Sequence, residues 1–243
     1  MKQSTRRLDL LLVARGLAES REKAQALILA GQVRVQGQKA AKPGQPVAVD
    51  CEVDVSKPPP YVSRGGGKLA AALDRFGIAV AERVCLDIGA STGGFTDCLL
   101  QRGAQRVYAV DVGSGQLNWR LRNDPRVVVR EGLNARYLRF EDVGETVDLV
   151  TCDVSFISAT MIIGPAAPLL KADGEMVILV KPQFEVGKGQ VGKGGIVRDP
   201  SLHEAACSRV RRVVESLGFQ ADLMESPILG AEGNREYLLY ARH

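Results

Sequence analysis

Seven apolar runs follow one another from residue 84 onward, and segments with helical periodicity separate most of them. The runs lie at residues 84–88, 106–110, 127–129, 147–152, 176–180, 221–225 and 236–241. Such alternation predicts a parallel β-sheet covered by helices on both faces. Only a loop joins the last two runs, which leaves no room for a crossover helix, so the last strand is expected to be antiparallel. The sequence therefore predicts an α/β domain built on a seven-stranded, mostly parallel sheet.

A proline-rich stretch, Lys57-Pro58-Pro59-Pro60, precedes this alternation. Proline fixes its own backbone angle and lacks an N–H donor, so the stretch can continue neither a helix nor a central strand. It is expected to form a stiff linker. We therefore expect a small domain over residues 1–57, a linker over 58–65 and the α/β domain over 66–243.

The small domain has the pattern of two short helices followed by a small sheet. Apolar spacing predicts a helix over residues 5–14. Ser20 is suited to cap a second helix that stops at Gly31. Short strands are expected at 33–35 and 47–49, with a turn at Gly37 after the first of them. The first 57 residues are thus expected to form an α+β domain.

Positive charge is concentrated in this domain, although the net charge of the whole chain is only +4. Residues 1–49 hold nine lysines and arginines against three acids. The excess favours contact with a polyanion such as RNA, but a solvated charged surface explains it about equally well. The residues expected to bind RNA are Arg6, Arg7, Arg15, Arg21, Lys23 and Arg34, with Arg64 from the expected linker.

Composition argues against several other classes of protein. No apolar run approaches the roughly 18 residues of a membrane helix, and the first residues lack the apolar core of a signal peptide. Five scattered cysteines without a C-x-x-C pair indicate a reducing compartment, so a cytoplasmic protein is expected. With two histidines, no metal site is expected, and the oligomeric state is left open.

A glycine-rich loop follows the first apolar run of the second domain. Its pattern is D-x-G-x-x-x-G-G, and it leads from a predicted strand into a predicted helix. Glycines there let the backbone turn sharply and approach a ligand closely. A carboxylate at the end of the next strand can bind ribose hydroxyls. The candidate cofactor-binding residues are Asp87, Gly89, Ala90, Ser91, Gly93, Gly94, Phe95 and Asp111.

Other interpretations of glycine-rich segments fit less well. A dinucleotide-binding loop would have G-x-G-x-x-G, whereas the acid at Asp87 suits a zwitterionic amino-acid cofactor better than a diphosphate. Residues 187–194 come close to a phosphate-binding P-loop, but Gly194 stands where serine or threonine is needed for magnesium. A tight turn without any ligand stays possible for the loop at Gly89.

Four charged residues are expected at the carboxyl edge of the sheet, where open parallel sheets bind their ligands. Asp153 and Lys181 each follow a predicted strand, and Glu236 begins the last, antiparallel one. Lys68 precedes the first strand and could fold over the site. A lysine made less basic by burial and by a second cation could accept the proton of a ribose 2′-hydroxyl, and the carboxylates would fix the ammonium groups. Structural ion pairs are the alternative.

Longer stretches resemble known families. RLDLLLVARGLAESREKAQALILAGQVRV resembles the S4 RNA-binding domain, and the loop at Gly89 resembles the first motif of S-adenosylmethionine methyltransferases. A parallel sheet that ends in an antiparallel hairpin is the pattern of Rossmann-like methyltransferases. The Lys-Asp-Lys-Glu set resembles the tetrad of FtsJ-like ribose 2′-O-methyltransferases.

The whole chain resembles the hemolysin A (TlyA) family, through the further stretches YVSRGGGKL, DVSFIS, VKPQFE, KGGIVRDP and GNREYLL. The resemblance implies catalytic roles for Lys68, Asp153, Lys181 and Glu236, with Lys181 as proton acceptor. It also implies methylation of a cytidine 2′-hydroxyl in 16S or 23S ribosomal RNA, or in both, with S-adenosylmethionine as cofactor. Two alternatives are an RNA- or ribosome-binding protein with an inactive second domain and a membrane-active hemolysin.

Overall fold

The computed structural model describes residues 4–56 and 59–243, and the chain divides into two compact units, Met1–Pro59 and Pro60–His243. Two residues of the expected linker stretch, Lys57 and Pro58, lie outside the described residues. Helix α3 (Arg64–Phe76) begins two residues inside the region expected to be linker. Each unit is described separately below.

The first unit packs two helices against two small antiparallel sheets. One sheet has the strand order β1-β4 and the other β3-β2-β5. A buried apolar core that includes Leu8, Leu12, Ile28 and Val33 joins helices and strands. The elements are β1 (Thr5–Arg7), α1 (Leu8–Ala14), α2 (Arg21–Leu29), β2 (Val33–Val35), β3 (Gln38–Lys39), β4 (Pro46–Ala48) and β5 (Val53–Val55).

The first helix is shorter than the sequence predicts. Residues 5–7, expected to be helical, instead form β1 and pair with β4. This pairing satisfies backbone groups that an isolated helix start would leave without partners. The N–H of Leu8 donates to the carbonyl of Gln45, and that of Asp9 to the carbonyl of Pro43. The expected cap of α2 is confirmed, because the Ser20 side chain accepts a hydrogen bond from the N–H of Lys23.

The second unit is built on a seven-stranded sheet with the order β11-β12-β10-β9-β6-β7-β8. The strands are β6 (Val84–Ile88), β7 (Arg106–Asp111), β8 (Val127–Glu131), β9 (Val147–Cys152), β10 (Leu170–Val180), β11 (Gln220–Glu225) and β12 (Tyr237–Arg242). Strands β6 to β10 pair in parallel, whereas β12 pairs antiparallel with both β10 and β11. The predicted fold class and the antiparallel last strand are confirmed.

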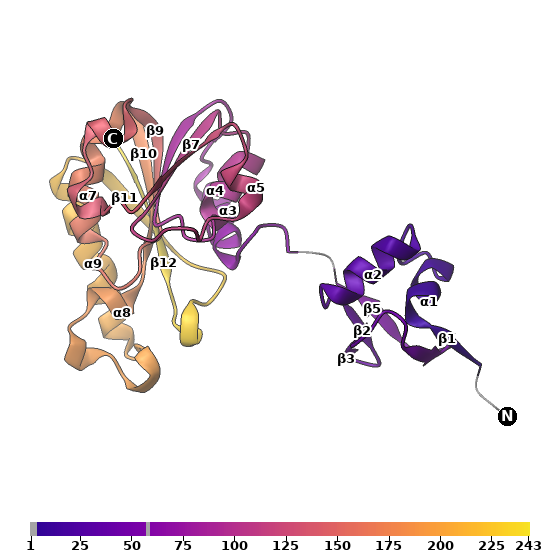
Figure 1. Ribbon diagram of the computed structural model, residues 1–243. Helices are drawn as coiled ribbons and strands as arrows, with labels where there is room; N and C mark the ends of the chain where they lie inside the picture. Colours follow the sequence, from indigo (N-terminus) through magenta and orange to yellow (C-terminus); the bar gives the residue numbers. More distant parts are fainter. Residues whose placement is uncertain (1–3, 57–58) are drawn as a thin grey trace. The chain divides into compact units, whose positions relative to one another are not determined.

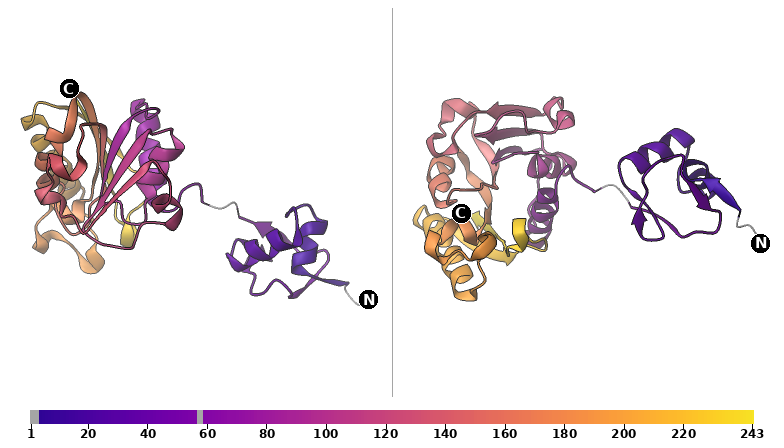
Figure 2. Two further views of the ribbon diagram at one scale, coloured as in Figure 1. Left: turned by 45° about the horizontal axis from the view of Figure 1, so that its top comes forward. Right: turned by 60° about the horizontal axis from the view of Figure 1, so that its bottom comes forward.

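Helices cover both faces of this sheet (Figures 1 and 2). Helices α3 and α4 lie on one face, and α7 and α9 on the other (Figure 1). Every residue of β6 is buried, as expected for a central strand with two covered faces. Besides α3, the helices are α4 (Gly94–Gln101), α5 (Trp119–Arg122), α6 (Phe140–Val143), α7 (Thr160–Ala166), α8 (Pro182–Glu185) and α9 (Pro200–Ser216), with 3₁₀ turns η1 (Ala135–Tyr137), η2 (Ala167–Leu169), η3 (Lys188–Gln190), η4 (Lys193–Gly195) and η5 (Ala231–Gly233).

Candidate active site

The loop between β6 and α4 closely approaches the segment that follows β9. Gly89 has φ +82°, and a Cβ atom there would lie 2.5 Å from the backbone oxygen of Asp153. The Gly89 N–H donates to the carbonyl of Val110 at 2.8 Å, which fixes the loop against β7. Gly93, with φ +95°, caps α4. Both positions need glycine because an L side chain is strained at such angles.

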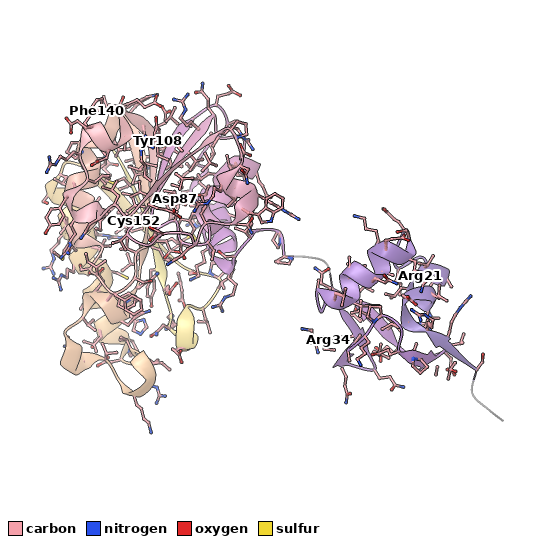
Figure 3. The ribbon with its side chains drawn as sticks, in the orientation of Figure 1. Arg21, Arg34, Asp87, Tyr108, Phe140 and Cys152 are labelled. Carbon is pink, nitrogen blue, oxygen red and sulfur yellow. The ribbon has the colours of Figure 1, made fainter. Side chains whose placement is uncertain are left out.

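Asp87 lies beneath this loop in the interior of the unit (Figure 3). Its carboxylate accepts hydrogen bonds from Thr96 Oγ1 at 2.6 Å and from Thr151 Oγ1 at 3.0 Å. It does not line the cavities described below, whereas the other expected loop residues except Gly93 do. Asp87 thus ties β6 to the first turn of α4 and to β9. Burial raises the pKa of Asp87 to about 6.

This shift predicts that Asp87→Asn stabilises the second unit at high pH. An unfolded aspartate ionises near pH ~3.9, so between about pH 4 and pH 6 the unfolded chain releases a proton that the native state keeps. The free energy of unfolding therefore falls across this range and stays lower above it, by up to ~3 kcal/mol. Asparagine carries no charge at any pH, and it can still bond both threonines.

Urea unfolding at pH 5 and pH 8 tests the prediction. The advantage of the asparagine variant should be larger at pH 8 than at pH 5. Asp222→Asn is the control, because Asp222 is exposed, and this variant should follow the wild type. An Asp87→Asn variant that is less stable than the wild type by the same amount at both pH values would contradict this explanation.

A cavity of about 550 Å³ lies beside the loop at the carboxyl edge of the sheet. Gly89 and Ser91 form one wall, Asp111 stands at the end of β7, and residues 133–136 and 153–157 close the other sides. Asp111 accepts hydrogen bonds from the N–H groups of Ser91 at 2.8 Å and Gly113 at 2.7 Å. The mixture of apolar walls with a carboxylate at the end of β7 suits a nucleoside.

A second cavity, of about 250 Å³, adjoins the first and contains the two lysines. Gly89, Ser91, Asp153 and Ser155 line both cavities. The second is also lined by Ser63, Arg64, Gly65, Lys68, Ala90, Thr92, Gly94, Phe95 and Lys181. The start of α3, the glycine-rich loop and the ends of β9 and β10 therefore meet at one place.

The four expected catalytic residues come together as two ion pairs. Lys68 and Glu236 form one pair, and both side chains are almost fully buried. In the other pair, Lys181 Nζ lies 2.6 Å from Asp153 Oδ1. The ammonium group of Lys181 also donates a hydrogen bond to Ser155 Oγ at 2.8 Å. Glu236 lies one residue before β12 rather than in it.

A third cavity, of about 390 Å³, opens on the other side of the lysines. Lys68 and Lys181 line it as they line the second cavity, and Glu236 joins them. Phe156 and Phe184 also line it, with ring centroids 5.2 Å apart and planes inclined at 51°. Phe156 is 92% exposed and has φ +65°, a strained conformation of the kind that clusters at functional sites.

Phe156, Ser155 and Gln183 also line these cavities and are not among the residues predicted from the sequence. The stretch DVSFIS contains the first two, but its letters give no sign that an aromatic ring is exposed there. Ser155 and Phe156 follow soon after the end of β9, at the edge where such sheets bind ligands, and this position could have marked both as candidates.

Several residues expected to bind RNA make local contacts in the first unit. Arg7 and Arg21 donate to the carboxylate of Asp9, which is fully buried. The Arg7 guanidinium holds the pKa of the Asp9 carboxyl far below its usual range. Arg15 donates to the carbonyls of Cys51 and Val49 at 2.8 and 2.6 Å.

Three of the other expected RNA-binding residues lie exposed on the first unit. Arg34 donates to the carbonyl of Gly37 at 2.9 Å and is labelled in Figure 3. Arg6 and Lys23 are exposed on the same unit. Arg64 belongs to the second unit and lines the second cavity.

Among residues 4–56 and 59–243, no group of three or more histidine, cysteine, aspartate or glutamate side chains could hold a metal ion. No helix in that part of the chain is long and apolar enough to cross a membrane. The five cysteines are buried and free.

Comparisons with known proteins agree on the two units. An FtsJ-like methyltransferase model matches residues 61–243, and an S4 domain model matches residues 6–53. The chain is 51% identical over 239 residues to the 16S/23S rRNA (cytidine-2′-O)-methyltransferase TlyA of Mycobacterium tuberculosis, covering 97% of this chain and 89% of that protein. It is 45% identical over 240 residues to Hemolysin A of Brachyspira hyodysenteriae, covering 96% and 98%. A solved structure from Streptococcus thermophilus, named as a hemolysin, is 42% identical with a TM-score of 0.75 and covers 99% and 89%.

Proposed function

Because the chain belongs to the FtsJ-like methyltransferase family and carries an S4 domain, we propose that it methylates a ribose 2′-hydroxyl of ribosomal RNA, with S-adenosylmethionine as methyl donor. The target base is cytosine, in 16S or 23S RNA or in both, as the name of the Mycobacterium tuberculosis relative states for that protein. An enzyme with this substrate works where ribosomes are, so we place it in the cytoplasm.

One observation carries the proposal: Lys68 and Lys181 line both the second and the third cavity. A methyl donor seated beside the Gly89 loop and a nucleotide entering from the third cavity would meet at these two ammonium groups. Reactions of this kind depend largely on holding the two reactants in line. The two cavities on either side of the lysines offer such an arrangement.

The residues around the first two cavities fit the proposed cofactor. Asp111, at the rim of the larger cavity, would bind ribose hydroxyls, since a carboxylate at the end of this strand commonly does so. Gly89 lines both cavities and has no side chain, so a ligand there can approach the loop backbone closely. Arg64 and Ser63, at the start of α3, would face the amino-acid end in the second cavity. The cofactor supplies an electrophilic methyl carbon on a positively charged sulfur.

Lys181 is the proton acceptor in this proposal. Lys181 must first release one proton of its ammonium group to solvent. The 2′-oxygen then forms a bond to the methyl carbon, the carbon–sulfur bond breaks, and the hydroxyl proton passes to the neutral Lys181 amine. Asp153 and Ser155 hold the nitrogen of Lys181 in place. The Lys68–Glu236 pair provides a second ammonium group beside the oxygen while its own charge is balanced.

The third cavity suits the target nucleotide. A base that leaves its stack is commonly received between aromatic side chains, and Phe156 and Phe184 lie on this cavity. The exposed basic residues of the S4 domain would hold the RNA backbone through their charge. We expect ribosomal subunits or ribosomal RNA as the partner.

Transfer of labelled methyl groups tests the function. Purified protein should transfer label from S-adenosylmethionine to ribosomal subunits or RNA from cells that lack it, and nuclease digestion should recover the label as 2′-O-methylcytidine. Binding of the cofactor without transfer to any ribosomal substrate would favour an RNA-binding protein with an inactive second unit. The name of the Brachyspira relative raises the further possibility of a hemolysin, which lysis of cells by a Lys181→Ala variant as well as by the wild type would support.

A further inference from the structure

Gln183 lines the third cavity, and the oxygen of its side-chain amide is a buried hydrogen-bond acceptor. Its Oε1 is inaccessible to solvent and has no hydrogen-bond partner within the described part of the chain. Such a group costs roughly 1–3 kcal/mol, and native structures contain few of them. An acceptor left without a donor next to a cavity indicates that a ligand provides the donor.

The position of Gln183 is fixed by its neighbours along the chain. It lies on α8, between Lys181 and Phe184, which line the same cavity. At the end of this helix the buried carboxylate of Glu185 accepts hydrogen bonds from Ser158 Oγ at 2.6 Å and the Ala159 N–H at 2.7 Å. This contact ties α8 to the segment after Phe156 and so keeps the backbone of Gln183 beside the cavity.

We propose that Gln183 is a specificity-determining residue that pairs with the Watson–Crick edge of the target cytosine. The proposal rests on the function proposed above. Cytosine carries an exocyclic amino group, whose N–H can donate to Oε1, and an N3 acceptor that can receive a hydrogen bond from Nε2. With the ribose at Lys181 and the ring beside Phe156 and Phe184, this edge faces the amide that follows Lys181.

A variant that removes the amide should separate recognition from stability. In Gln183→Met the side chain keeps its length but has no strong hydrogen-bonding group. Because an unpaired buried acceptor is lost, the melting temperature of the free protein should stay the same or rise. For wild-type RNA, kcat/KM should fall by about 10- to 100-fold. A residue with a purely structural role would show the opposite pattern on stability.

An altered substrate tests the contact itself. Synthetic RNA is ligated so that the nucleotide methylated by the wild-type protein is either cytidine or its 2-pyrimidinone analogue, which lacks the amino group. The wild type should lose about 10- to 100-fold in kcat/KM on the analogue. For Gln183→Met, kcat/KM on the analogue should equal its already lowered kcat/KM on the cytidine RNA. Gln105→Met is the matched control, since Gln105 is exposed and lies before β7, and it should behave as the wild type.

The outcomes separate this inference from the proposed function. If the wild type transfers no methyl group to the cytidine RNA, the proposed function fails. If the wild type does methylate the cytidine RNA, two results would overturn the inference. One is full activity of Gln183→Met on the cytidine RNA. The other is a further loss of kcat/KM by this variant on the analogue as large as the loss that the wild type shows, because Gln183 then does not contact the amino group.

Discussion

Replacing Lys181 by arginine is expected to lower single-turnover methyl transfer by about 10³-fold, the scale of general-base catalysis, while cofactor affinity stays nearly unchanged. Arginine keeps the positive charge beside Asp153 and Ser155, but a guanidinium cannot release its proton in a protein. It therefore cannot accept the proton of a 2′-hydroxyl. Lys181→Ala should be similarly inactive.

A control variant and a binding measurement accompany the Lys181→Arg experiment. Lys171→Ala removes the lysine of an exposed ion pair with Asp148, and this control should keep wild-type activity. Calorimetry with S-adenosylhomocysteine reports whether the cofactor site survives in each variant. Full activity in Lys181→Arg would show that Lys181 supplies only charge, and that another group takes the proton.

Gly89→Ala is expected to weaken cofactor binding by more than ~100-fold. The new methyl group would lie 2.5 Å from the backbone oxygen and 2.9 Å from the carbonyl carbon of Asp153. Backbone atoms cannot turn aside as a side chain can, so either the loop or the segment after β9 has to shift, and both line the first two cavities. The positive φ adds about 1–2 kcal/mol of strain.

Gly144→Ala separates the strain from the collision. Gly144 has a similar φ of +88°, but a Cβ atom there would meet nothing within 4 Å. This variant should lose some stability, since it bears the same backbone strain, and should bind S-adenosylhomocysteine as the wild type does. Unchanged affinity in Gly89→Ala would show that the loop tolerates a side chain and does not hold the cofactor closely.

The sequence predicted the sheet well because its central strands are buried on both faces. All five residues of β6 are buried, which gives an apolar run that needs no knowledge of its neighbours. The missed strand β1 differs, since Thr5–Arg7 is exposed and its conformation depends on pairing with residues about 40 positions away. Local apolar spacing carries no information about such a partner.

The site shows the same limit. Strand ends identified Asp153, Lys181 and Glu236 as candidates, but the sequence could not tell which carboxylate pairs with which lysine, because partner choice depends on the packing of α3 against β12. Nor could it reveal that Asp87 is shut away beneath the loop, or that Asp9 draws Arg7 and Arg21 together. The charge composition shows how many basic residues a segment has. It does not show which of them are already ion-paired with a buried carboxylate of the same domain.

The pairing of Lys68 with Glu236 spans 168 positions of the chain. A ribosome adds about 5–20 amino acids per second, so the lysine is made roughly ten to thirty seconds before its carboxylate. Throughout that interval the ammonium group of Lys68 lacks this counter-ion. A product of premature termination before codon 236 would therefore lack the ammonium–carboxylate pair, and on the proposed function we expect such a product to transfer no methyl group.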